Sequence, residues 1–239
     1  MKKSKVLILM LALILAFSSC DKWTLDDDGD LDINGGEPEK VVVVNDGELY
    51  GTIEYVSECS KGLDTPRYFV YVAPLGDESD VWIPFIVDGS TEILKVGNTV
   101  KITYFGTDLD GTMRRDGFVA ESISLTDATR AEGNKNPLAI GSDYVLDRAE
   151  AVMTTDFGTV VHVARVETGA SGYLVYLDGA YYDIGNLVCY WVDDNAIFTE
   201  EALDHLSKGM TGYQLKISGV ANSPYENIDI EAAVSVSIK

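Results

Sequence analysis

The chain has 239 residues, of which 46% are hydrophobic and 24% are charged, and this balance is typical of a folded globular protein. Its 18 basic and 39 acidic residues give a formal net charge of −21. Phosphate binding needs clustered lysine and arginine, so this charge argues against a nucleic-acid partner and is simply accounted for by solubility.

The first residues predict an export signal. Three lysines precede an apolar run of 12 residues, Val6 to Phe17, which is too short for the roughly 20 residues of a membrane-spanning helix. Ser18-Ser19-Cys20 follows and resembles the lipobox of bacterial lipoproteins. The resemblance implies that residues 1–19 are a signal peptide and that Cys20 becomes the lipidated first residue. An ordinary signal peptide followed by an unrelated cysteine is the alternative.

Residues 20–40 are rich in Asp, Glu and Gly, and they predict an acidic, flexible tether. The run Asp26-Asp27-Asp28 close behind Cys20 resembles the surface-export signal of Bacteroidota lipoproteins. That resemblance implies a lipid-anchored protein of the outer membrane, exposed at the cell surface or otherwise held on the periplasmic face. A solvated, charge-extended tether is the simpler interpretation, and the two are compatible.

Residues 41–126 form the first predicted domain, because β-branched and aromatic runs alternate there with turn residues. A short helix is expected at Ser90–Val96, ended by Gly97. The expected strands are Val41–Val44, Tyr50–Ser57, Tyr68–Ala73, Val81–Val87, Val100–Phe105 and Phe118–Leu125. The polar residues 127–142 are the natural linker to a second domain.

Residues 143–239, the second predicted domain, repeat the order of the first. Gly51-Thr52-Ile53 recurs as Gly158-Thr159-Val160 at an offset of 107 residues. Tyr68–Val72 recurs as Tyr173–Leu177 at an offset of 105 residues. The strand ending at Leu125 matches the one ending at Ile238, 113 residues further on, so the insertions fall in loops and the strands keep their register.

The clearest helix follows in the second domain, at Thr199–Gly209. Thr199 is a good N-cap, Glu200 and Glu201 suit the positive end of the helix dipole, and Gly209 is a typical C-terminal stop. It corresponds in order to the helix expected at Ser90–Val96.

The order of three strands, a helix and two strands is that of the oligonucleotide- and oligosaccharide-binding (OB) barrel. The sequence therefore predicts an all-β fold of two tandem OB-like five-stranded barrels, each with a short helix. Two β-sandwich domains are the alternative, favoured by the extra leading strand of each unit. The arrangement also resembles secreted Bacteroidota lipoproteins of the NigD-like kind.

Catalytic patterns are missing from the sequence. His162 and His205, the two histidines, have no second His or Cys at ligand spacing, so no metal is expected, and no phosphate loop or nucleophile elbow predicts a cofactor or a catalytic residue. Cys59 and Cys189 fall at unlike positions of the two repeats and are expected to be free thiols. We therefore expect a protein that is not an enzyme.

Aromatic residues supply the candidate ligand site. Tyr68 and Tyr71 recur as Tyr173 and Tyr176 on the strand that forms the ligand face of OB domains, and Tyr181 and Tyr182 follow nearby. Residues 41–126 carry a net charge of −8 and residues 143–239 one of −10, which favours a neutral ligand such as a glycan, or a protein. The alternative is that these tyrosines are core and edge-strand residues.

The sequence thus predicts an envelope-anchored, non-enzymatic binding or interaction lipoprotein that recognises a protein partner or a glycan and no nucleic acid. The alternative is a structural subunit of an outer-membrane complex without a small ligand. A hydrolase whose catalytic site escapes recognition is a third, weaker hypothesis.

Overall fold

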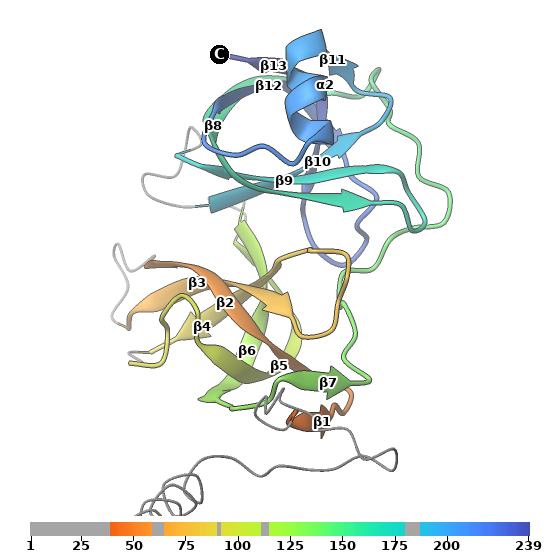
Figure 1. Cartoon of the computed structure of the whole chain (residues 1–239). Coiled ribbons are helices and arrows are strands. Elements are labelled where there is room, and N and C mark those ends of the chain that lie inside the picture. Colours follow the sequence, from red (N-terminus) through yellow and green to blue (C-terminus); the bar gives the residue numbers. More distant parts are fainter. Residues whose placement is uncertain (1–38, 59–64, 90–91, 111–114, 180–186) are drawn as a thin grey trace, which may run out of the picture. The chain divides into compact units, whose positions relative to one another are not determined.

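The computed structural model describes residues 39–58, 65–89, 92–110, 115–179 and 187–239 (Figure 1). The chain divides into two units, Met1–Glu39 and Lys40–Lys239, and the second unit holds every strand and helix described below. No helix of the described part is long and apolar enough to cross a membrane. The predicted signal peptide, Cys20 and the tether up to residue 38 lie outside the described residues.

The first barrel is a closed ring in the order β2-β3-β4-β6-β5. Its strands are β2 (Glu48–Glu58), β3 (Arg67–Pro74), β4 (Ile83–Asp88), β5 (Thr99–Asp110) and β6 (Arg115–Leu125). Neighbouring strands are antiparallel except β4 and β6, which pair in parallel and close the ring. This order and this single parallel pair define the OB topology.

The second sheet has the order β10-β9-β8-β12-β13-β11, and a further pairing of β10 with β13 closes five of its strands into a second ring. Its elements are β8 (Val152–Val166), β9 (Gly172–Asp178), β10 (Leu187–Asp193), β11 (Ile197–Phe198), α2 (Glu200–Ser207), β12 (Gln214–Asn222) and β13 (Glu231–Ile238). The closing β10–β13 pair is again parallel. The all-β, OB-like fold is therefore confirmed, and the two closed rings replace the β-sandwich alternative.

The two rings share one register, residue by residue. Gly51 of β2 lies opposite Val100 of β5, and the corresponding Gly158 of β8 lies opposite Leu215 of β12. The strand-bulge also recurs: β2 shifts register between Ile53 and Tyr55, and β8 between Val160 and His162. The sequence offsets thus describe a duplicated scaffold whose insertions lie between strands.

The helix expectations were half right. As predicted, α2 begins after Thr199, whose hydroxyl accepts a hydrogen bond from the Ala202 amide. It ends at Ser207 with Lys208 as its C-cap, just before the predicted stop at Gly209. The helix expected at Ser90–Val96 is wrong for the part that is described, since residues 92–97 form turns and no helix. There the amide of Lys95 and the side chain of Asn98 both donate to the Ile93 carbonyl, which closes a tight turn in place of a helical one.

Two expectations at the domain edges also differ from the structure. The leading strand β1 (Val41–Val43) does not join the barrel but pairs in parallel with β7 (Arg130–Glu132), which lies inside the predicted linker. Tyr50 packs with Ala131 beneath this small sheet. In the second domain, the extra leading strand expected before Gly158 is not a separate strand, because β8 runs without a break from Val152 to Val166. Sequence pattern alone cannot identify such pairings, because each joins segments far apart in the chain.

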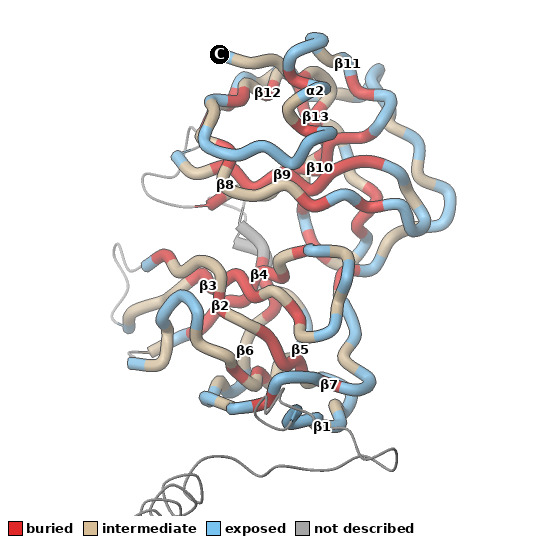
Figure 2. The backbone as a smooth tube through the Cα atoms, in the orientation of Figure 1, coloured by how far each residue is buried: buried red, intermediate tan, exposed pale blue. Residues whose placement is uncertain are grey.

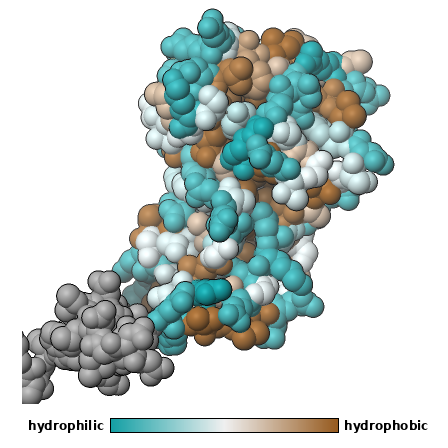
Figure 3. Space-filling model, turned by 45° about the vertical axis from the view of Figure 1, so that its right-hand side comes forward, coloured by the Kyte–Doolittle hydropathy of each residue, from teal (hydrophilic) through white to brown (hydrophobic). Residues whose placement is uncertain are grey.

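Apolar residues of the described part form two main cores. Figure 2 shows that the buried residues lie largely along the strands of the barrels. One core lies inside the second barrel and includes Ala202 and Leu206 of α2. The other fills the first barrel and continues into the second through Tyr71, Tyr176 and Trp191. On the face shown in Figure 3, apolar side chains reach the surface at separate places among hydrophilic ones.

Candidate ligand-binding site

Two of the predicted site residues, Tyr71 and Tyr176, lie at the junction of the two barrels. The hydroxyl of Tyr71 on β3 donates to the carbonyl of Leu187 at 2.9 Å, and the hydroxyl of Tyr176 on β9 donates to the carbonyl of Trp82 at 2.8 Å. Tyr71 and Tyr176 are equivalent in the repeat, and so are Trp82 and Leu187, at the same offset of 105 residues. The two hydrogen bonds are therefore reciprocal, as in a two-fold symmetric dimer.

Further aromatic contacts surround this pair. The rings of Tyr71 and Tyr176 meet edge to face with their centroids 5.9 Å apart. His162 stacks on Trp82 at 4.0 Å, and its Nε2 lies 2.6 Å from the backbone oxygen of Asp80, which requires the proton on Nε2. Such aromatic pairs add about 0.5–1.5 kcal/mol each beyond the area that they bury.

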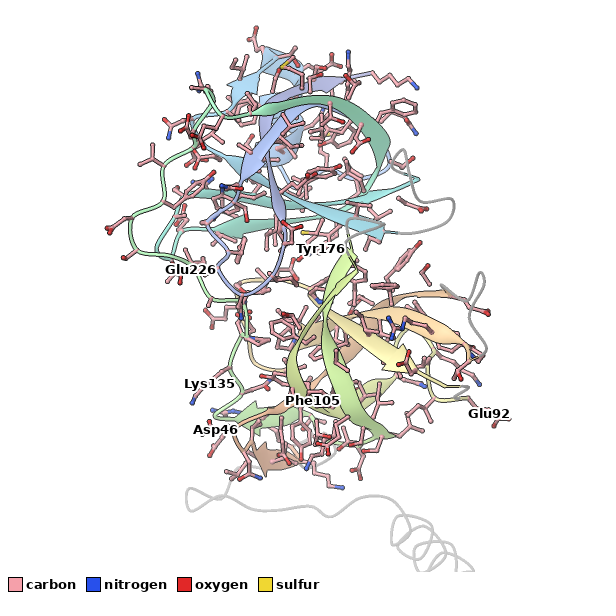
Figure 4. All side chains as sticks on the ribbon, turned by 180° about the vertical axis from the view of Figure 1, so that it is seen from behind. Asp46, Glu92, Phe105, Lys135, Tyr176 and Glu226 are labelled. Atoms are coloured by element: carbon pink, nitrogen blue, oxygen red, sulfur yellow. The ribbon has the colours of Figure 1, made fainter. Side chains whose placement is uncertain are left out.

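Tyr71 and Tyr176 are consequently not ligand-stacking residues, and that prediction is corrected. Their exposed fractions are 5% and 0%, and both hydroxyls are engaged across the junction. Tyr176 lies where the strands of the two barrels approach each other (Figure 4). The repeated tyrosines result from the symmetry of an internal interface, where each copy supplies the same contact to the other.

Tyr68 and Tyr173 also face protein. Tyr68 is half-buried against the first core. Tyr173 is buried in the second core, and the Arg165 guanidinium lies over its ring, 4.7 Å from the centroid. Tyr181 and Tyr182 lie outside the described residues.

Arg165 belongs to a charged network that the sequence analysis missed. Its Nη1 and Nη2 donate to the two carboxylate oxygens of Asp194 at 2.5 and 2.9 Å, and Nη2 also donates to Ser171. This bidentate pairing lowers the pKa of Asp194, because the guanidinium stabilises the carboxylate. The residues lie in different strands and loops, so no local sequence signal marks the network.

A cavity of about 630 Å³ lies beside this network, and segments of both barrels line it. The β3–β4 loop contributes residues 77–81, the connection from β7 to β8 contributes residues 136–140, and the end of β8 with its turn contributes residues 165–168. Tyr225, between β12 and β13, completes the wall. The volume lies in the range of about 300–1,000 Å³ that is typical of small-molecule sites.

The wall of this junction cavity is rich in hydrogen-bond acceptors around an apolar part. Val81, Leu138 and Ile140 are apolar, whereas Glu78 and Glu167 bring carboxylates. Two further lining residues also carry polar groups. Asp77 Oδ2 and Ser79 Oγ are buried and have no hydrogen-bond partner within the described part of the chain. Such atoms cost roughly 1–3 kcal/mol each when nothing satisfies them, so this loop has unused capacity for hydrogen bonds.

The described residues give little support for a metal site or a reactive cysteine. No group of three or more His, Cys, Asp or Glu side chains there is placed to hold a metal ion. Cys189 is a free thiol, and burial raises its pKa well above the usual range, which disfavours the reactive thiolate. Cys59 lies outside the described residues.

Fold and cavity together define a tandem OB-fold protein with a candidate pocket at the barrel junction. No protein-family model matches the sequence, and no curated protein matches it. Among solved structures, a tetrameric p202 HIN2 is similar, with a TM-score of 0.26 and 12% identity over 81% of this chain and 94% of that chain. The wild-type single-stranded DNA binding protein from Thermus aquaticus has a TM-score of 0.25 and 12% identity, over 80% of this chain and 91% of that chain.

The Thermus aquaticus structure is named for single-stranded DNA binding, and the expectation that this chain has no nucleic-acid partner is not retained. The expectation rested on net charge, which is a sum over the whole chain and does not exclude a local contact with unpaired bases. At TM-scores of 0.25 and 0.26 the similarity does not identify a ligand for this chain.

Proposed function

We propose that this protein is a non-enzymatic, envelope-anchored lipoprotein that binds a glycan in the cavity at the junction of its two OB barrels. The observation that carries the proposal is the cavity itself, about 630 Å³ in volume and lined by both barrels and their connection. The lipobox-like Ser18-Ser19-Cys20 and the acidic residues after it support the anchor.

The lining favours a ligand that supplies hydrogen-bond donors. Asp77, Glu78 and Glu167 present carboxylates, which can only accept hydrogen bonds when ionised. Arg165, the cation in the lining, is paired with Asp194 and, through Nε at 3.3 Å, with Glu167. Sugar hydroxyls donate to carboxylates and carry no charge to be neutralised, while sugar C–H faces pack on apolar groups such as Val81 and Leu138.

Isothermal titration of the mature chain with glycans selected on an array tests this proposal. The double variant Glu78→Gln with Glu167→Gln should weaken binding at least about tenfold, or about 1.4 kcal/mol, because each substitution replaces a charged acceptor by a weaker neutral one. Glu200→Gln with Glu201→Gln on α2 makes the same change in charge away from the cavity and should leave the affinity unchanged. Equal losses in the two double variants would contradict a site in the cavity.

A single-stranded oligonucleotide belongs in the same titrations. Tight binding of the oligonucleotide with no glycan bound would make nucleic acid the ligand. If neither binds, and crosslinking captures one stoichiometric protein partner, a structural role in an outer-membrane complex replaces ligand binding.

A further inference from the structure

A second hollow lies at the end of the second barrel, between the segment 144–150 and the ends of three strands. It has a volume of about 460 Å³, and its strand residues come from the start of β8, the end of β12 and the start of β13. These ends are adjacent because Val152 pairs with Val220, and Asn222 with Glu231. We call this hollow the end groove.

Exposed aliphatic side chains form part of the end groove. Val145 and Val152 both line it, and their exposed fractions are 81% and 63%. Met153, the next residue of β8, is 86% exposed. Apolar side chains gathered at a concave surface are typical of a protein contact, because burying them there removes apolar area from water.

The lining of the end groove also includes acidic side chains. Asp147, Glu150, Asp229 and Glu231 line it, and its lining includes no lysine or arginine. Arg148, the basic residue within the segment 144–150, donates to the carbonyl of Asn195. The residues that line the groove therefore bring acidic side chains and no basic one.

Acidic character continues beyond the groove. A neighbouring hollow of about 290 Å³ shares Tyr144 with the end groove and adds Asp143 and Glu226, the latter on the β12–β13 loop (Figure 4). Because the two hollows share Tyr144, the acidic residues that line them lie on adjoining surfaces.

We propose that the end groove is a docking surface for a basic segment of another protein, one that places an aliphatic side chain against Val145 and Val152 and lysine or arginine among the carboxylates. Charge complementarity selects this partner, since a neutral apolar segment would leave the carboxylates facing apolar groups, and an acidic segment would be repelled. The proposal is independent of the junction cavity.

Fluorescence anisotropy with a short synthetic peptide of alternating lysine and leucine tests the proposal on the mature chain. Asp147→Asn with Glu150→Gln should weaken binding at least about tenfold. Asp147→Asn keeps the acceptor that Asp147 Oδ1 offers to the Ala149 amide, so the local turn is preserved. Val145→Ser should also weaken binding, and as the most exposed residue of the pair it is the safer variant for folding.

Two controls separate docking from general attraction to an acidic protein. Glu200→Gln with Glu201→Gln removes the same charge from α2 and should leave the affinity within about twofold. A peptide with serine in place of leucine should bind at least about tenfold more weakly. No binding by the unmodified protein, equal losses in the two charge variants, or equal affinity for the serine peptide would each overturn the proposal.

Discussion

At the scale of single residues, one pair of hydrogen bonds explains why the same tyrosine appears in both halves. Tyr71 and Tyr176 each donate a hydroxyl proton to a backbone carbonyl of the other barrel, so each copy of the repeat needs its own tyrosine. Burial raises the pKa of Tyr176 well above its usual value, so this hydroxyl remains a donor at any ordinary pH.

Replacing either tyrosine by phenylalanine should destabilise the protein by about 1–2 kcal/mol, because a buried carbonyl loses its partner while the ring packing remains. The free energy of unfolding in urea gives the measurement. Tyr68→Phe, on the same strand as Tyr71 but half-buried, should cost less than about 0.5 kcal/mol. Losses of equal size at Tyr68 and Tyr71 would argue against reciprocal bonds across the junction.

Acid should weaken the Arg165–Asp194 pair. The folded state lowers the pKa of Asp194 below its ordinary value of 3.8, so the stabilisation is present above that value and is lost as the pH falls through the folded pKa. Its size is small, because the Asp194 side chain is 39% exposed. The stability difference between the unmodified protein and Asp194→Asn should shrink as the pH is lowered from 6 to below about 3. A difference that stays constant over this range would contradict the assignment.

At the scale of elements, hydrogen bonds around each segment explain why one of the two predicted helices forms and the other does not. Thr199 is the N-cap of α2, and this helix forms where the local signals predict it. Ser90–Val96 has similar local signals, but its described residues close a turn through Asn98 instead. Gly97 and Asn98 are also held by backbone hydrogen bonds with Ile53 of β2, and such tertiary contacts outweigh propensities of a few tenths of a kcal/mol per residue.

Thr199→Ala should cost about 1 kcal/mol, since the N-cap hydroxyl that accepts from the Ala202 amide is lost. Thr199→Ser keeps that hydroxyl and should cost far less. Thermal unfolding followed by circular dichroism compares the two variants. A Ser variant as unstable as the Ala variant would show that the threonine methyl group, rather than the cap, matters.

The same scale shows why the candidate site escaped sequence analysis. The repeat matches Tyr71 to Tyr176, but a sequence pattern cannot distinguish a strand face that binds a ligand from one that packs on a second copy of the same unit. The junction cavity joins residues near 77, 136 and 165, which no periodicity connects. Register was predictable because the offsets between repeats are a property of the sequence itself.

At the scale of the whole molecule, a duplicated barrel offers a site that a single barrel does not have. The continuous core through Tyr71, Tyr176 and Trp191 ties the two rings into one unit, Lys40–Lys239, and the junction cavity takes residues from each. Ligand binding should therefore depend on both halves of the chain.

Membrane attachment belongs to the same scale. Cys20→Ala should move the protein from the membrane fraction to the soluble fraction, because acyl chains contribute roughly 0.8 kcal/mol for each buried methylene group. Replacing Asp26–Asp28 with alanine should keep the anchor but reduce protease access on intact cells. Membrane attachment that survives Cys20→Ala would contradict lipidation, and unchanged protease access would contradict the export signal.

The most direct test of the central claim is an NMR titration of the mature protein with the tightest glycan from the array. The junction cavity predicts that the largest amide shifts fall in residues 77–81, 136–140 and 165–168 together, with α2 unaffected. Shifts confined to one barrel, or centred on the end groove, would contradict the cavity as the glycan site.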